Sequence, residues 1–213
     1  MKKRTLLTGL ALAAATAVTA IAPAAPAGAR GNTVSSSTIA DVLLADSAKD
    51  GADGFDRRWH DYDIVTQAVL LFPDLVAAAS DPAASLTVLA PTDEAFRRLV
   101  KDLTGTWYRS EADVFAAVAA LGTDTVKAVL TYHIVGSKVG LGAVLASDNQ
   151  AIPTLGGGTF TIDVRSKRWV FVEFVDNDPN ARNPYLTKVN VGGSELSNGF
   201  IHGIDRVLRP TDL

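Results

Sequence analysis

The sequence of 213 residues contains no cysteine. This absence excludes disulfides, thiolate metal ligands, thiol nucleophiles and lipid attachment to a cysteine. Histidine is scarce too, with only His60, His133 and His202, and no two of them have the short spacing of helical or hairpin metal sites. The sequence therefore predicts a domain that is held together by packing alone, with no cofactor and no histidine metal centre.

The chain also has no stripe of basic residues and, after its first residues, no long hydrophobic run. Residues 1–29 combine three basic residues, an alanine-rich apolar run and a small-residue end, the pattern of a secretory signal peptide cleaved after Ala29. Removing them changes the balance of 20 basic and 23 acidic residues to 17 against 23. We therefore expect a secreted, acidic and monomeric protein that does not bind nucleic acid and has no membrane span after cleavage.

Residues 30–37 have the composition of a short polar linker, and residues 38–211 have the length and patterning of one domain. The first half shows helical periodicity, with Pro73 expected to split the helix that begins near Ile64. The second half alternates like strands at 156–165, 168–175, 186–191 and 200–208. Helices followed by strands predict an α+β fold, and their closeness in the chain favours antiparallel pairing.

Three motifs, "TVLAPTDEAF" (87–96), "LTYHIV" (130–135) and "NGFIHGIDRVLRP" (198–210), occur in an order and at spacings that resemble the fasciclin domain over residues 36–211. The resemblance implies an antiparallel β-sandwich or wedge packed against a bundle of short helices. It also implies a bacterial, secreted adhesion module without catalytic activity. The chain departs from the adhesive animal members, since Gly193-Ser194 stands before the third motif and the tripeptide Arg-Gly-Asp is missing. Integrin binding is therefore not expected.

The first and third motifs contain residues that we interpret as structural. His202 alternates with Phe200 and Ile204, which predicts a buried imidazole with partners inside the protein. Thr92 is placed to cap the helix that follows it, and Asp205 is assigned a structural role in the third motif.

In the second motif, His133 lies on the apolar stripe of a predicted helix and is also expected to be buried. The hydroxyl of the neighbouring Tyr132 is expected to reach the surface. The pair Tyr132 and His133 is therefore the candidate contact for a partner.

The segment 175–186 has the character of an added loop. Its residues Asp176, Asp178 and Asn180 match the first alternating ligands of a calcium loop, but Ala181 and Thr187 replace the glycine and glutamate that such a loop needs. We interpret the segment as a polar turn with side-chain to backbone hydrogen bonds. Calcium binding, assisted by Asp61 or Asp63 from the second added loop at 46–63, is the alternative.

These observations leave two functions open. The first is a secreted, non-enzymatic module that binds an extracellular protein, polysaccharide or cell-surface partner. The second is an enzyme or carbohydrate-binding protein with a cleft between loops 46–63 and 175–186, in which Trp59, Tyr62 and Tyr185 would stack on a ligand. No Gly-x-Ser-x-Gly elbow supports a serine hydrolase.

Overall fold

A computed structural model describes residues 34–48 and 54–213. Residues Asn32–Leu213 form one compact unit. The predicted signal peptide, the start of the predicted linker and the middle of loop 46–63 lie outside the described residues.

The first three helices are placed by local sequence signals. Helix α1 (Ile39–Ser47) begins with a capping box, in which Thr38 and Asp41 satisfy each other's backbone N–H groups. The expected break at Pro73 is confirmed, because α2 (Asp63–Leu70) and α3 (Pro73–Ser80) meet at an angle of 113°. Proline fits the first turn of a helix, where no N–H is required, and there it starts the second helix.

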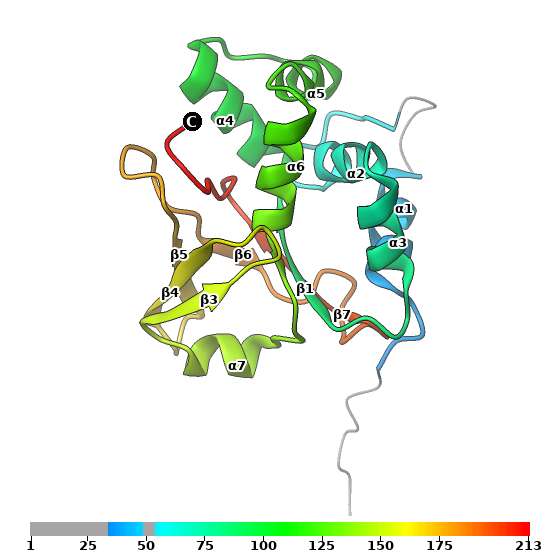
Figure 1. Ribbon diagram of the computed structural model, residues 1–213, viewed down its shortest axis with the longest axis vertical. Helices are drawn as coiled ribbons and strands as arrows, with labels where there is room; N and C mark the ends of the chain where they lie inside the picture. Colours follow the sequence, from blue (N-terminus) through cyan, green and yellow to red (C-terminus); the bar gives the residue numbers. More distant parts are fainter. Residues whose placement is uncertain (1–33, 49–53) are drawn as a thin grey trace, which may run out of the picture. The chain divides into compact units, whose positions relative to one another are not determined.

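Three further helices complete the bundle that lies beside the sheets in Figure 1. The Thr92 hydroxyl accepts from the backbone N–H of Ala95 and caps α4 (Asp93–Thr104), as expected. Ser110 caps α5 (Glu111–Ala119) in the same way, and α6 (Thr123–Tyr132) follows it.

The longer sheet is mixed, with the strand order β2-β1-β7-β6. Its strands are β1 (Leu86–Pro91), β2 (Ile134–Val135), β6 (Leu186–Lys188) and β7 (Gly199–Ile204). Contrary to the expected antiparallel pairing, β1 and β7 run parallel in a register from Leu86–Gly199 to Pro91–Ile204. Gly199 has φ of +150°, and a Cβ there would collide with the Leu86 carbonyl, so this register requires glycine.

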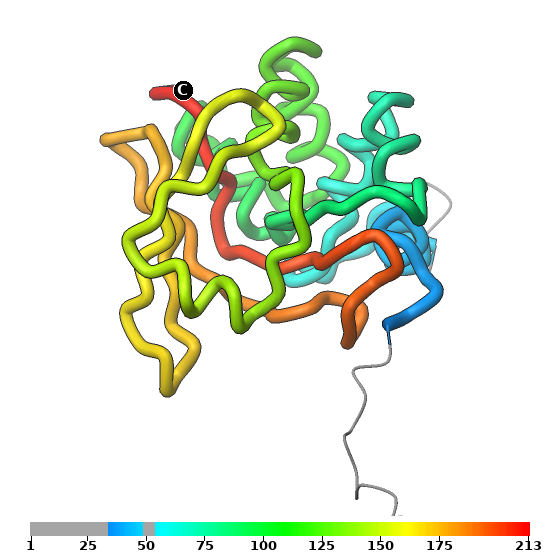
Figure 2. Tube along the Cα trace, turned by 60° about the horizontal axis from the view of Figure 1, so that its bottom comes forward, coloured from blue at the N-terminus to red at the C-terminus, as the bar shows by residue number. Residues whose placement is uncertain are grey.

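The second sheet is antiparallel, with the order β3-β4-β5. It consists of β3 (Gln150–Pro153), β4 (Thr159–Ser166) and β5 (Phe171–Val175), and α7 (Leu141–Ala146) precedes it in the chain. The prediction that a strand begins at Arg168 is wrong, because residues 167–170 form the turn between β4 and β5. In Figure 2 this hairpin runs out at the edge of the unit, away from helices α1 to α6.

Two hydrophobic clusters hold the layers together. The larger one joins the helices to β1 and β7, and the smaller one lies between the second sheet, α7 and the end of α6. The expected α+β class is confirmed. Within the described part of the chain, no single helix is long and apolar enough to cross a membrane, and two bent helix pairs pass that test only by length and composition.

Candidate functional site

His133 is a structural residue at the end of α6. It is 3% exposed, its Nδ1–H donates to the Val129 carbonyl at 2.7 Å, and its Nε2 accepts from the Leu208 N–H at 2.9 Å. Burial lowers the pKa of His133 to about 4, so the ring is neutral near pH 7. The predicted burial is confirmed, and the imidazole joins α6 to the chain beyond β7.

His202 has the same role in β7. It is fully buried, its Nε2–H donates to the Val139 carbonyl at 2.9 Å, and its Nδ1 accepts from the Asn190 N–H at 3.3 Å. The ring stacks on Phe200 at 6.0 Å between centroids. Burial lowers the pKa of His202, so this imidazole also stays neutral. The predicted burial and the internal partners of His202 are confirmed.

The expected surface position of the Tyr132 hydroxyl is wrong. Tyr132 is 1% exposed, and its hydroxyl donates to the Thr159 carbonyl at 2.6 Å, beneath β4. The end of α6 points into the smaller core, where the Tyr132 ring packs edge-on against Phe160. In this conformation Tyr132 and His133 offer no surface to a partner.

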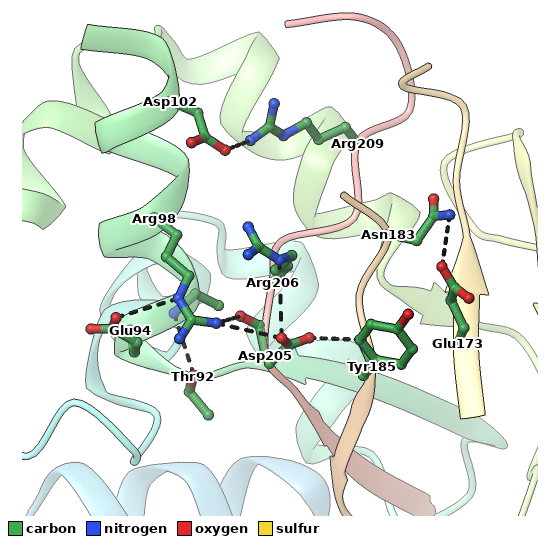
Figure 3. A network of polar contacts seen from close by, with 11 residues as sticks. Thr92, Glu94, Arg98, Asp102, Glu173, Asn183, Tyr185, Asp205, Arg206 and Arg209 are labelled. Atoms are coloured by element: carbon green, nitrogen blue, oxygen red, sulfur yellow. Dashed lines mark hydrogen bonds and ion pairs between the residues drawn. The ribbon is translucent and has the colours of Figure 1, made fainter. Parts of the chain in front are cut away.

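Asp205 connects three elements just after β7 (Figure 3). Its carboxylate accepts from the Tyr185 N–H at 2.6 Å and lies 3.4 Å from a guanidinium nitrogen of Arg98 on α4. The Nε of Arg98 lies 3.3 Å from Glu94. These contacts support the structural role assigned to Asp205, because they join the strand end, the approach to β6 and α4.

Beside this network is a cleft of about 350 Å³. Its two carboxylates, Glu94 and Asp205, both pair with Arg98. The cleft corresponds only in part to the predicted one, because loop 46–63 lines it with His60 and Tyr62 whereas loop 175–186 contributes no residue. The lining residues are His60, Tyr62, Thr92, Glu94, Arg98, Thr187, Lys188 and Asp205.

The three aromatic residues predicted to stack on a ligand do not form a shared platform. Tyr62 is 3% exposed and belongs to the larger core. The guanidinium carbon of Arg97 lies 4.2 Å from the ring centroid of Trp59, which it covers. Tyr185 stacks on Phe171, with ring centroids 4.8 Å apart and planes 9° from parallel. Because each ring already has a protein partner, the predicted ligand-stacking cleft is not formed.

The segment that contains Asp176 and Asp178 is a hydrogen-bonded turn, as expected. Asp176 accepts from the N–H groups of Asp178 and Arg209, at 3.1 and 2.8 Å. Asp178 accepts from the N–H groups of Asn180 and Ala181 and pairs with the Arg209 guanidinium at 3.1 Å. Protein donors therefore use the oxygens that a calcium ion would need.

A buried carboxyl group at the start of α4 was missed by sequence reasoning. Asp93 is fully buried, and its carboxyl accepts from the N–H of Ile64 at 2.8 Å, so it caps α2. One carboxyl oxygen each of Asp61, Asp93 and Glu111 lie within 4.8 Å of one another. Burial, followed by the hydrogen bond to Asp61, raises the pKa of Asp93 to about 10. Asp93 is therefore a protonated cap, and not a charge that favours the α4 terminus.

The most exposed large apolar side chain of the described residues is Trp169, which is 76% exposed in the turn between β4 and β5. Phe171, two residues after Trp169, is 46% exposed. The cations Lys167 and Arg168 directly precede Trp169. We define the hairpin surface as Lys167, Arg168, Trp169, Phe171 and Tyr185. The polar run Ser166-Lys167-Arg168 between two alternating stretches is the sequence signal that could have indicated this turn.

Comparison with known proteins gives one family. The family model of the fasciclin domain matches residues 62–210 of the sequence. A search of curated proteins found no match. The structure resembles a pair of such domains from the insect cell adhesion molecule fasciclin I, with a TM-score of 0.55 and 16% identity. That match covers 82% of this chain and 51% of the insect chain, about half its length. By the extent of the family match, this chain belongs to the fasciclin domain family.

Proposed function

We propose that this protein is an extracellular, non-enzymatic adhesion module that contacts its partner through the hairpin surface. The observation that carries the proposal is the 76% exposure of Trp169 on a turn at the edge of the domain. Tryptophan and arginine dominate the energetics of binding interfaces, and here they are adjacent in the chain. Membership of a family of adhesion modules agrees with this role.

The chemistry of the cleft supports a module over an enzyme. An enzyme that uses paired carboxylates needs one of them protonated or free to accept a proton. Arg98 instead lies between Glu94 and Asp205 and keeps both in ion pairs. Tyr62, the one aromatic residue in the lining, is almost fully buried and presents no ring to a sugar.

An adhesion assay tests the proposed contact. Beads coated with the protein are allowed to bind the envelope and extracellular-polymer fraction of the producing organism, and bound beads are counted. Trp169→Ala is expected to lower binding at least about tenfold, as for a hot-spot residue. Trp107→Ala is the matched control, because Trp107 is 45% exposed but lies under Arg97 on the helical side. Equal binding by parent and Trp169→Ala would refute the proposed contact.

Secretion is part of the same proposal. We propose that residues 1–29 act as a cleaved signal peptide, on the basis of their basic start, apolar run and small-residue end. N-terminal sequencing of the protein from culture medium is expected to begin at Arg30. Retention of Met1, or recovery only with detergent, would contradict this.

A further inference from the structure

We propose that the hairpin surface binds an acidic polysaccharide, a polymer of sugar rings with uronic acid carboxylates. This partner class rests on the proposed function, which names the surface but not the ligand. The proposal needs apolar faces for sugar rings and free cations for carboxylates, and the hairpin provides both.

The apolar part comes from three aromatic rings that follow the hairpin from its tip into the second sheet. Trp169 is at the tip, and Phe171 begins β5. Tyr185 stacks on Phe171 and joins β5 through an isolated bridge to Glu173. Aromatic faces bind the C–H groups of sugar rings, and the exposed Trp169 ring offers such a face. Phe171 and Tyr185 cover one face of each other and add apolar surface at the start of β5.

The charged part comes from two cations that form no ion pair within the described part of the chain. Arg165, on β4, pairs with Glu173 at 2.7 Å and with Asp163 at 3.1 Å. Lys167 and Arg168, by contrast, lie within ion-pair distance of no carboxylate of the described residues. The Arg168 guanidinium instead lies 5.2 Å from the Trp169 ring centroid, so a carboxylate bound to Arg168 would lie beside a sugar on Trp169.

The acidic net charge of the chain does not prevent this contact. Charges are screened over about 8 Å at physiological ionic strength. The electrostatic attraction that an anionic polymer meets at the hairpin tip is therefore set by the cations of the tip itself. A polymer with one carboxylate on each sugar can match two isolated cations. The small number of cations favours this partner over the dense charge of nucleic acid.

The size of the surface argues against the other macromolecular partners. A stable protein interface buries about 800 Å² on each partner, which a four-residue turn with two neighbouring rings does not provide. Stable attachment to a membrane takes two anchoring signals, such as an acyl chain with a polybasic patch. One tryptophan with two cations falls short of that.

The chain contains its own matched control. Arg57-Arg58-Trp59 repeats the order of two cations and a tryptophan that is seen in Lys167-Arg168-Trp169. In the control segment, Arg58 pairs with Asp56 at 3.1 Å, and Arg97 covers Trp59. The two segments share composition and differ in the exposure of the tryptophan, which is partly buried at Trp59 and 76% exposed at Trp169, so exposure can be separated from sequence.

The test is equilibrium binding of the full secreted protein to polygalacturonate and to the same polymer with its carboxylates methyl-esterified. We expect the parent to bind polygalacturonate at least about tenfold more tightly than the ester, the equivalent of one good charged contact. Trp169→Ala is expected to weaken binding about tenfold or more. The double variant Lys167→Gln and Arg168→Gln is expected to reduce binding to the level of the ester and to lose its salt dependence. Arg57→Gln with Arg58→Gln should bind like the parent.

Three results would overturn the proposal. These are equal binding to both polymers, equal weakening by the control variant, or Trp169-dependent binding to phosphatidylglycerol vesicles without binding to polygalacturonate. Unchanged melting temperatures of all variants establish that they are folded. If Trp169→Ala loses adhesion to the extracellular fraction but the parent does not bind polygalacturonate, the partner class is wrong and the proposed function stands. If Trp169→Ala keeps adhesion, the proposed function itself fails.

Discussion

At the scale of single residues, His133 shows how a polar side chain can stabilise the fold from within a core. Both ring nitrogens are hydrogen-bonded, one as a donor and one as an acceptor, and the neutral imidazole supplies both roles. His133→Ala removes two hydrogen bonds and leaves the Leu208 N–H unpaired. We expect a loss of about 1–3 kcal/mol at pH 7 for the polar groups, with a further cost for the cavity. Urea unfolding measures this loss.

The pH dependence of the same variant separates a buried neutral histidine from simple loss of packing. The folded pKa of about 4 lies below the ordinary value of 6.5, so the unfolded chain binds the proton more readily. The stabilisation is complete above pH 6.5 and is lost as the pH falls toward 4. The gap between parent and His133→Ala should therefore narrow over this range. A gap that is constant with pH would contradict the assigned neutral state.

Asp93 gives a second prediction for a single residue, in which the change of stability with pH has the opposite sign. Its pKa is raised in the folded state, so its contribution to stability is complete below the unfolded value of 3.8 and is lost as the pH rises toward 10. Asparagine can imitate the protonated acid, since its amide oxygen can accept from Ile64 and its NH₂ can donate to Asp61. Asp93→Asn should therefore be more stable than the parent at pH 9, while Asp93→Ala should lose the α2 cap.

Urea unfolding of both Asp93 variants at pH 5, 7 and 9 checks this. A parent whose stability does not change between pH 7 and 9, or an Asp93→Asn variant that is less stable than the parent at pH 9, would show that Asp93 is ionised in the fold.

At the scale of elements, the turn around Asp176 and Asp178 predicts an absence of response to calcium. Backbone N–H groups and Arg209 already occupy these carboxylates. Millimolar calcium should leave the melting temperature unchanged. With free calcium at a hundred times the dissociation constant, a true calcium site would instead raise the free energy of unfolding by about 2.7 kcal/mol. A shift of several degrees that disappears in Asp178→Ala would contradict the assignment. Differential scanning calorimetry with magnesium as the control provides the measurement.

Some elements could be predicted from the sequence because their signals are local. Thr38, Thr92 and Ser110 cap the helices that follow them. Alternation about His202 correctly placed it in the interior. These signals depend only on residues that are close in the sequence and therefore stay close in the folded chain.

Other features depend on partners that are distant in sequence. The parallel pairing of β1 with β7 shows the same alternation as an antiparallel pair, so the pattern alone cannot give its direction. Asp93 caps a helix that is thirty residues away, a role with no local signal. Trp169 has strand propensity, which concealed the turn, and Val170 departs from strand geometry with φ of +51°. The missed turn is the reason that the hairpin surface was not a candidate.

At the scale of the whole molecule, the described domain keeps its polar core groups apart from its most exposed tryptophan. Both predicted core histidines and Tyr132 are enclosed by protein partners, and the cleft carboxylates are neutralised by Arg98. The most exposed aromatic residue, Trp169, lies instead on a turn at the edge of the second sheet, directly after Lys167 and Arg168. In this account, substitutions in the interior change stability, and substitutions on the hairpin surface change binding at constant stability.

The three tryptophans allow this distinction to be tested directly, because the environment of Trp169 differs from that of the other two. Trp59 and Trp107 lie against Arg97, and Trp169 is exposed on the hairpin. Fluorine NMR of protein labelled with fluorotryptophan, with each signal assigned by a tryptophan to phenylalanine substitution, follows all three during titration with the extracellular-polymer fraction. The Trp169 signal is expected to shift or broaden while the other two stay in place. A shift of Trp59, near the cleft, with an unchanged Trp169 signal would contradict it.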